Sequence, residues 1–169
     1  SYIFITKSDG QVNQDLLDTI HKYKPKAEII ECTHKPQYLV KVNGQDKLPL
    51  SAIKNKRVAA LSAIAMPDSF ENFLTSLGAS VALSQRFIDH HRFEIEELDL
   101  FFQQAKESSI EFIITTEKDA VRIPPYFKPN IPLYFLRMEI DILNGENGFA
   151  EAISRICFPK QELRAVNQE

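Results

Sequence analysis

The chain has 169 residues, a formal net charge of −3, and a composition that is 44% hydrophobic and 25% charged. These values suit one globular domain with at most a small appendage, and they exclude the fibrous and disordered classes. The weakly acidic balance gives no electrostatic reason to bind nucleic acid, so we expect no nucleic-acid partner. Cys32 and Cys157 lie far apart without metal-ligand spacing, which is typical of a reduced, cytoplasmic protein. We expect neither a membrane span, which needs ~20 apolar residues, nor a signal peptide.

Hydrophobic periodicity predicts strands that alternate with helices along the chain. The expected strands are 2–6, 27–32, 57–62, 80–85, 111–115 and 133–138, and the expected helices are 12–20, 67–77, 94–105, 116–122 and 148–158. The pair Asn43-Gly44 between two apolar runs favours a hairpin at 38–50, because this pair suits a type I′ turn. The first strand begins without a preceding cap or tail, so we expect the chain to be cut from a longer one.

This alternation predicts an α/β fold with a mainly parallel, Rossmann-like sheet, helices on both faces, and a small β-hairpin insertion. Because the hairpin interrupts the rhythm, we place a junction there. The expected parts are the end of a preceding lobe with a hairpin linker at 1–55, a Rossmann-like domain at 56–159, and a flexible polar tail at 160–169.

Three polar segments follow three of the expected strands, at 62–68, 86–92 and 115–119. The carboxyl ends of parallel strands open on one edge of a sheet, and ligands bind there in α/β proteins. We therefore expect the three segments to form one functional edge. The first segment also has a purely structural explanation, since Pro67 is a good first residue for a helix.

The second segment contains Asp89, His90 and His91, flanked by Arg86 and Arg92. One imidazole could simply bond a backbone carbonyl while the other faces water. A histidine can, however, take a proton from a hydroxyl near neutral pH, and a neighbouring carboxylate fixes its tautomer and raises its basicity. The pattern therefore favours a functional Asp–His pair over a structural one.

The third segment, Thr116 to Asp119, resembles a helix capping box with Asp in place of the usual Glu. Capping explains Thr116 and Asp119 but not Lys118, because a cation in the first turn opposes the helix dipole. A bound anion such as a phosphate, or a nearby carboxylate, would explain this lysine. The sequence contains no GxxxxGK[ST] phosphate loop, the standard means of holding nucleotide phosphates.

Taken together, these segments resemble the C-terminal half of the tetraacyldisaccharide 4′-kinases, which phosphorylate the lipid A precursor. The family pattern F-x-D-H is matched by F-I-D-H at 87–90, and T-E-K-D-A-V-[KR] by T-E-K-D-A-V-R at 116–122. The sequence S-A-I-A-M-P-D-S-F at 62–70 is similar to the family segment A-G-I-G-x-P-x-x-F, with Ala63 and Ala65 in place of its glycines. The resemblance covers most of the chain.

The resemblance implies the C-terminal lobe of a P-loop kinase that transfers the γ-phosphoryl group of ATP to the 4′-hydroxyl of a tetraacyldisaccharide 1-phosphate. It implies a monomeric enzyme of lipopolysaccharide synthesis, cytoplasmic and in peripheral contact with the inner membrane. The family's phosphate loop and Mg²⁺-binding acids belong to the preceding half. ATP and Mg²⁺ would therefore be held mainly there, no metal site is expected here, and this chain alone would be inactive.

The resemblance also places the catalytic histidine on His90, with Asp89 beside it, rather than on His91. In this role His90 would orient or deprotonate the sugar hydroxyl together with an aspartate from the preceding half. We assign substrate or phosphate binding to four charged residues of the same edge. These are Arg92, Glu117, Lys118 and Asp119.

Two other functions fit parts of the pattern. A DHH-type phosphoesterase would use Asp89, His90 and His91 as Mn²⁺ ligands, although such a site needs further acids that we do not find in the sequence. A non-catalytic α/β module would bind an anion at 116–119 and give His90 no role.

Overall fold

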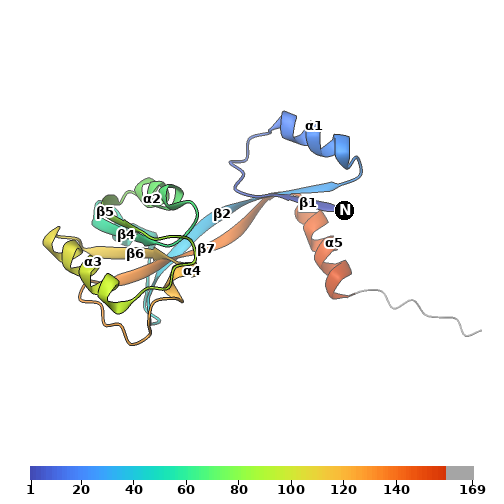
Figure 1. Ribbon diagram of the computed structural model, residues 1–169. Coiled ribbons are helices and arrows are strands. Elements are labelled where there is room, and N and C mark those ends of the chain that lie inside the picture. The colour runs from blue at the N-terminus through green and yellow to red at the C-terminus, as the bar shows by residue number, and fades with distance from the viewer. Residues whose placement is uncertain (159–169) are drawn as a thin grey trace, which may run out of the picture. The chain divides into compact units, whose positions relative to one another are not determined.

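The computed structural model describes residues 1–158, and its strands and helices alternate along the chain (Figure 1). In order the elements are β1 (Tyr2–Ile5), α1 (Gln14–Tyr23), β2 (Glu28–Lys41), β3 (Lys47–Leu48), the 3-10 turn η1 (Leu50–Ile53), β4 (Arg57–Ser62), α2 (Pro67–Ser76), β5 (Ser80–Arg86), α3 (Ile95–Glu107), β6 (Phe112–Thr116), α4 (Glu117–Ala120), β7 (Leu133–Asn144) and α5 (Glu146–Cys157). The tail predicted at 160–169 lies outside the described residues. Among these helices, none has the length and apolar character that crossing a membrane requires.

The chain forms two compact units, and their boundaries differ from the predicted division at 55/56. The larger unit is Pro36–Glu139, and the smaller unit joins Ser1–Lys35 to the segment that begins at Ile140. Residues 36–55 belong to the larger unit because Leu39, Val42 and Ile53 lie in its hydrophobic cores. β2 and β7 each continue from one unit into the other, which the local sequence pattern did not reveal.

In the larger unit the strand order is β3-β2-β7-β6-β4-β5. β4 pairs in parallel with both β5 and β6, and β6 pairs in parallel with β7, which confirms the mainly parallel sheet. β3 pairs antiparallel with β2, so the predicted hairpin forms. Its turn is not type I′, because only Asn43 of the Asn-Gly pair has a positive φ, 57°, and a type I′ turn needs two.

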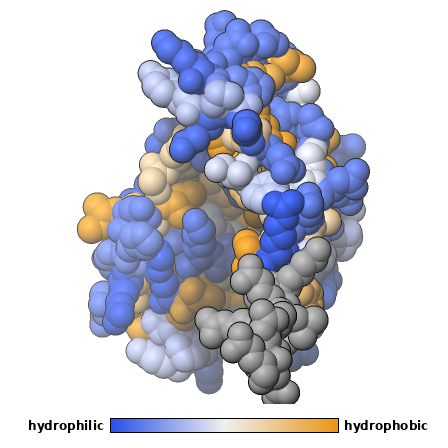
Figure 2. Space-filling model, turned by 90° about the vertical axis from the view of Figure 1, so that its right-hand side faces the viewer, coloured by the Kyte–Doolittle hydropathy of each residue, from blue (hydrophilic) through white to orange (hydrophobic). Residues whose placement is uncertain are grey.

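Helices cover both faces of this sheet, with α2 on one side and α3 on the other (Figure 1). Successive residues of a strand point to opposite faces, so neighbouring positions of β4 enter different cores. On the α3 side the core includes Leu61, Leu98, Phe101, Phe102 and Ile113, and on the α2 side it includes Ala60, Phe70, Leu74 and Ile114. Hydrophilic residues dominate the face of the molecule seen in Figure 2.

The smaller unit is built on β1, which pairs in parallel with β2 from Tyr2↔Glu28 to Ile5↔Glu31. Its first helix starts later than the sequence predicts, at Gln14 rather than 12. The reason is the cap: the Asn13 side chain accepts a hydrogen bond from the Leu16 N–H at 3.1 Å, which sets the helix start. The ring of Phe4 packs edge to face on that of Phe149, with centroids 5.7 Å apart.

An ion pair joins the end of β5 to α2 and so holds the start of the Asp89–His91 segment. The Glu71 carboxylate accepts from Arg86 Nε at 2.7 Å and from Arg86 Nη2 at 2.8 Å. These hydrogen bonds lower the pKa of Glu71 below its usual value, against the smaller opposing effect of burial, and they raise the pKa of Arg86. A bidentate pair of this kind fixes geometry as well as adding stability.

We expect Glu71→Gln to lower the free energy of unfolding at pH 7 by about 1 kcal/mol, since a charge-assisted bond is lost and Arg86 is partly exposed. The pKa of Glu71 is lower in the folded than in the unfolded chain. Its stabilisation is therefore full above the unfolded pKa and disappears as the pH falls through the folded one. Urea unfolding from pH 7 to pH 3 should show the difference between the two proteins narrowing as the pH falls below the unfolded pKa of a glutamate, about 4.3. Glu139→Gln, at an exposed carboxylate, is the control, and a Glu71→Gln deficit that does not narrow between pH 7 and pH 3 would contradict the assignment.

Candidate active site at the carboxyl edge of the sheet

The three predicted polar segments meet at one edge of the larger unit. Register brings them together, because Ser62 at the end of β4 pairs with Arg86 of β5, and Leu61 pairs with Thr115 of β6. The chain then leaves all three strands at the same edge, as expected for parallel pairing.

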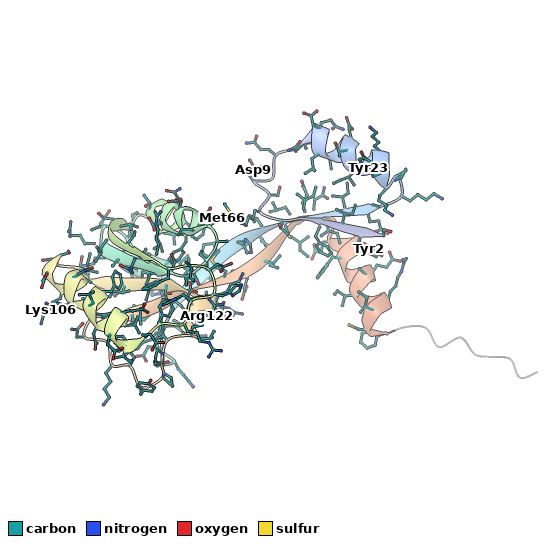
Figure 3. The ribbon with its side chains drawn as sticks, viewed as in Figure 1. Tyr2, Asp9, Tyr23, Met66, Lys106 and Arg122 are labelled. Atoms are coloured by element: carbon teal, nitrogen blue, oxygen red, sulfur yellow. The ribbon has the colours of Figure 1, made fainter. Side chains whose placement is uncertain are left out.

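Backbone hydrogen bonds join the segment after β5 to the segment after β4. Phe87 N–H donates to Ser62 O at 2.9 Å, and His90 N–H donates to Ala63 O at 3.2 Å. Arg122 lies at the same end of the larger unit as Met66, which is on the segment after β4, while Lys106 lies at the other end (Figure 3). Residues from three separate segments thus form one contiguous surface.

A buried carboxylate lies at the centre of this edge. Asp119 has a side chain that is 0% exposed. Its Oδ2 accepts from Ala63 N–H at 3.0 Å and from the Thr116 hydroxyl at 2.8 Å, and its Oδ1 accepts from Arg122 Nη1 at 3.1 Å. A buried charge is tolerated when it is paired and fully hydrogen-bonded, which is the case here. The predicted role of Asp119 in substrate binding does not fit this geometry, since no oxygen of the carboxylate faces solvent.

The predicted cap at the start of α4 is confirmed. Thr116 Oγ1 accepts from the backbone N–H of Asp119 at 3.2 Å while its own hydroxyl donates to the Asp119 carboxylate. The two residues therefore fix each other, and both are explained without a ligand.

Arg122 contacts His90 through Nη2, while its Nη1 binds Asp119. Arg122 Nη2 lies 2.8 Å from His90 Nδ1, and the Arg122 side chain is only 21% exposed. The His90 ring itself is 77% exposed, with its Nε2 3.7 Å from Asp89 Oδ2, which is too long for a hydrogen bond. The backbone of His90 has a φ of 67°, a region that residues other than glycine rarely adopt. Asp89 and His90, predicted to act as a pair, thus lie near each other at the surface of the edge without a hydrogen bond between their side chains, and His90 has a constrained backbone.

His91 has a different environment from its neighbour. Its ring stacks on Phe87 with centroids 4.5 Å apart and an interplanar angle of 9°, and its Nε2 lies 2.7 Å from Glu97 Oε2. The hydrogen bond from His91 is the main cause that lowers the pKa of Glu97, and the same carboxylate accepts from the Glu94 N–H at the start of α3. His91 therefore anchors the segment to α3, and His90 is the histidine left at the surface.

The remaining predicted binding residues differ in their contacts. The Glu117 carboxylate pairs with Arg137 of β7, so it is engaged within the protein. Lys118 and Arg92 are exposed, and within residues 1–158 the structure gives neither a hydrogen-bond or ion-pair partner. Also within this range, no three His, Cys, Asp or Glu side chains gather as a metal site would require.

Arg122 was not among the residues singled out by sequence reasoning, although it belongs to the T-E-K-D-A-V-R segment. The available signal was its spacing, because positions i and i+3 of a helical turn face each other and Asp119 lies three residues earlier. Its contact with His90 spans 32 residues of sequence, and no local pattern could show it.

These observations place the protein in a class: α/β proteins with a candidate site at the carboxyl edge of a parallel sheet. In this site Asp89 and His90 lie at the surface, and the Arg122–Asp119 ion pair contacts His90 from within. The sequence model of the tetraacyldisaccharide-1-P 4′-kinase family, LpxK, matches residues 3–157. The chain belongs to this family, which confirms the resemblance drawn from its motifs.

Curated tetraacyldisaccharide 4′-kinases match over most of this chain. The protein of Anaeromyxobacter dehalogenans (strain 2CP-C) is 37% identical over 127 residues, which is 74% of this chain and 34% of that protein. The protein of Halothermothrix orenii is 31% identical over 156 residues, 84% and 40% respectively, and that of Elusimicrobium minutum is 30% identical over 167 residues, 96% and 42%. The chain thus spans about a third to two-fifths of the length of these relatives.

The fold is also shared with a solved structure. A crystal structure of LpxK from Aquifex aeolicus, an "apo" form in complex with ATP, matches 92% of this chain and 51% of that chain with a TM-score of 0.55. Sequence identity is 17%, so this likeness concerns the fold.

We predict that the two histidines differ in their contribution to stability. His91→Ala should lower the free energy of unfolding by about 1.5 kcal/mol, because it removes a hydrogen bond to a carboxylate and an aromatic stack. His90→Ala should lower it by at most about 0.5 kcal/mol, since the ring is largely exposed. Urea titrations of both variants test this, and equal losses would contradict the separate roles of the two rings.

Among the carboxylates of the edge, we expect substitution of Asp119 to cause the largest loss in the free energy of unfolding. Asp119→Asn should lower the free energy of unfolding by about 3 kcal/mol. The amide NH₂ would face groups that themselves donate hydrogen bonds, and the Arg122 guanidinium would lose its charge partner. Glu117→Gln, which alters a partly exposed ion pair, should cost less than about 1 kcal/mol. Thermal and urea unfolding give the comparison, and a loss at Asp119 no larger than at Glu117 would refute its central place.

Proposed function

We propose that this chain forms the C-terminal part of a lipid kinase that transfers the γ-phosphoryl group of ATP to the 4′-hydroxyl of a tetraacyldisaccharide 1-phosphate, the precursor of lipid A. The observation that carries this proposal is His90, held by Arg122 and Ala63 at the sheet edge with Asp89 beside it, within the region matched by the family. Phosphoryl transfer requires chiefly positioning and charge stabilisation from the protein, which a rigid edge of this kind can supply.

In this reaction His90 would contact the sugar hydroxyl and orient it towards the phosphoryl group, with Asp89 beside the ring at 3.7 Å. An aspartate from outside this sequence would complete the pair of groups around the hydroxyl. His91 has no place in this scheme, because Phe87 and Glu97 hold its ring.

Lys118 and Arg92 are the residues of the edge suited to bind phosphate. Both are exposed cations, and a phosphate is a ligand of matching charge for an ammonium or a guanidinium group. Glu117 and Asp119, by contrast, would act within the protein by holding Arg137 and Arg122 in place.

ATP and Mg²⁺ would be held mainly by residues outside this sequence. The chain contains no GxxxxGK[ST] loop, and residues 1–158 offer no cluster of ligands that fits a metal ion. We therefore assign this chain no step through Mg²⁺. As part of the complete enzyme we place it at the cytoplasmic face of the inner membrane, in peripheral contact and monomeric, and we expect it to be inactive alone.

The two alternative functions have less support. For a DHH-type phosphoesterase, His91 would have to leave Glu97 and the face of Phe87 to bind Mn²⁺. For an anion-binding module, the constrained backbone of His90 and its bond to Arg122 would be without purpose, and strained residues cluster at functional sites.

The proposal is tested by complementation of a bacterial strain depleted of its own 4′-kinase. The complete gene that encodes this sequence should restore growth, its His90→Ala variant should not, and His91→Ala should restore growth if the protein accumulates. Immunoblots establish protein levels. Full rescue by His90→Ala would remove this residue from the reaction, and no rescue by the wild type at normal levels would argue against the kinase.

Two further measurements separate the alternatives. Calorimetry with Mn²⁺ should show no stoichiometric binding, whereas binding lost in both His90→Ala and His91→Ala would favour the phosphoesterase. The 169-residue chain incubated with ATP and the lipid substrate should show no turnover, and measurable lipid-dependent turnover would overturn our view that it is inactive alone.

A further inference from the structure

Four hydrogen bonds around the edge form a closed ring. Asp119 Oδ2 accepts from Ala63 N–H, and Ala63 O accepts from His90 N–H. Arg122 Nη2 then contacts His90 Nδ1, and Arg122 Nη1 returns to Asp119 Oδ1. The backbone and the imidazole of His90 are therefore connected to the same buried carboxylate by two independent routes.

The chemistry of Arg122 decides how the protons of His90 are arranged. A guanidinium has five N–H donors and no acceptor, and it does not lose its proton in proteins. Because Arg122 can only donate, His90 Nδ1 must accept, and the proton of the neutral ring lies on Nε2. A proton on Nδ1 would point at Nη2 from 2.8 Å, so the doubly protonated ring cannot keep this hydrogen bond.

The direction of Arg122 is determined by Asp119 rather than by His90. The Asp119 side chain is 0% exposed and that of Arg122 is 21% exposed, whereas that of His90 is 77% exposed. Of these three side chains, the buried Asp119 therefore has the least freedom to move, and the exposed His90 has the most. The backbone of His90 is left-handed, with a φ of 67°, and Nδ1 of its ring lies 2.8 Å from the guanidinium.

We propose that Arg122 is a positioning residue that locks His90 in the Nε2–H tautomer, so that this histidine serves as a hydrogen-bond donor and not as the proton acceptor. Its one lone pair is bound by Arg122, and Nε2–H has no partner closer than Asp89 Oδ2 at 3.7 Å among the contacts of its ring. The acceptor for Nε2–H is an oxygen of the substrate or of a catalytic carboxylate.

This inference deepens the proposed kinase function and rests on it where it concerns catalysis. Two roles were open for His90, which could orient the sugar hydroxyl or deprotonate it. The inferred tautomer favours the orienting role. The hydroxyl proton must then leave to another group, which the complete enzyme supplies. The tautomer itself is a property of this chain and can be measured without the reaction.

The first test is chemical modification of the 169-residue chain with diethyl pyrocarbonate, which acylates an imidazole nitrogen that has a free lone pair. His21 and His34 are exposed and serve as internal references. Although exposed, His90 should react about tenfold more slowly than these two, since reaction requires it to leave a charge-assisted hydrogen bond. Peptide mass spectrometry gives the three rates. A wild-type His90 that reacts as fast as His21 would overturn the proposal.

Substitution of Arg122 provides the second test. Arg122→Lys keeps the charge but cannot bridge Asp119 and His90 with one planar group, so the His90 rate should rise to that of His21. Arg137→Lys is the matched control, because it makes the same change at the ion pair with Glu117 and should leave His90 slow. If His90 in the Arg122→Lys variant is modified at the same rate as in the wild type, Arg122 does not hold the tautomer and the proposal is refuted.

A spectroscopic measurement on the wild type does not depend on any variant folding. Two-bond nitrogen–proton correlations of the ¹⁵N-labelled chain should show His90 protonated at Nε2 and unprotonated at Nδ1. A scalar coupling across the hydrogen bond should connect Nδ1 with Arg122 Nη2. Protonation at Nδ1 of the neutral ring would contradict the structure's assignment.

In the complete enzyme, Arg122→Lys should lower kcat about tenfold with little change in KM, because orientation and not binding is lost. Combining it with His90→Ala should give no further loss beyond His90→Ala alone, as expected for residues that act as one unit. Additive losses would mean that Arg122 acts apart from His90. An inactive wild type would defeat the proposed function, while the modification rates would still decide the tautomer.

Discussion

The buried carboxylate of Asp119 is the interaction on which the candidate site depends. A charge without solvent must find its hydrogen bonds within the protein, and here each one comes from a different place: a backbone N–H after β4, a hydroxyl at the end of β6, and a guanidinium after α4. Satisfying Asp119 therefore requires these segments to meet in one arrangement. The arrangement of the site therefore follows from the need to hydrogen-bond one carboxylate that is removed from water.

The sheet makes this meeting possible. β4 lies between β5 and β6 and pairs in parallel with both, so the chain leaves all three strands at the same edge. The cores on the α2 and α3 faces cover both sides of the paired strands, and the Glu71–Arg86 pair fixes the end of β5. The segment with the two histidines can then be irregular, because its ends are anchored.

Two adjacent histidines have opposite tasks in this arrangement. His91 is bound through both its ring face and its Nε2 and so stabilises the segment, while His90 is exposed with its Nδ1 occupied. The positive φ of His90 is the price of presenting its ring beside Arg122. The curated relatives that this chain matches are longer proteins, and the chain spans 34% of the length of the one from Anaeromyxobacter dehalogenans (strain 2CP-C).

The sequence by itself determined the alternation of strands and helices, the parallel α/β class, the meeting of three polar segments at one edge and the family, because these depend on periodicity, turn chemistry and short motifs. Only the tertiary structure decided that 36–55 belongs with the larger unit, that Asp119 is buried, and that Arg122 holds His90. Those facts arise from contacts between residues tens of positions apart. Local patterns record the propensity of each segment, but burial and long-range hydrogen bonds exist only once the segments have packed.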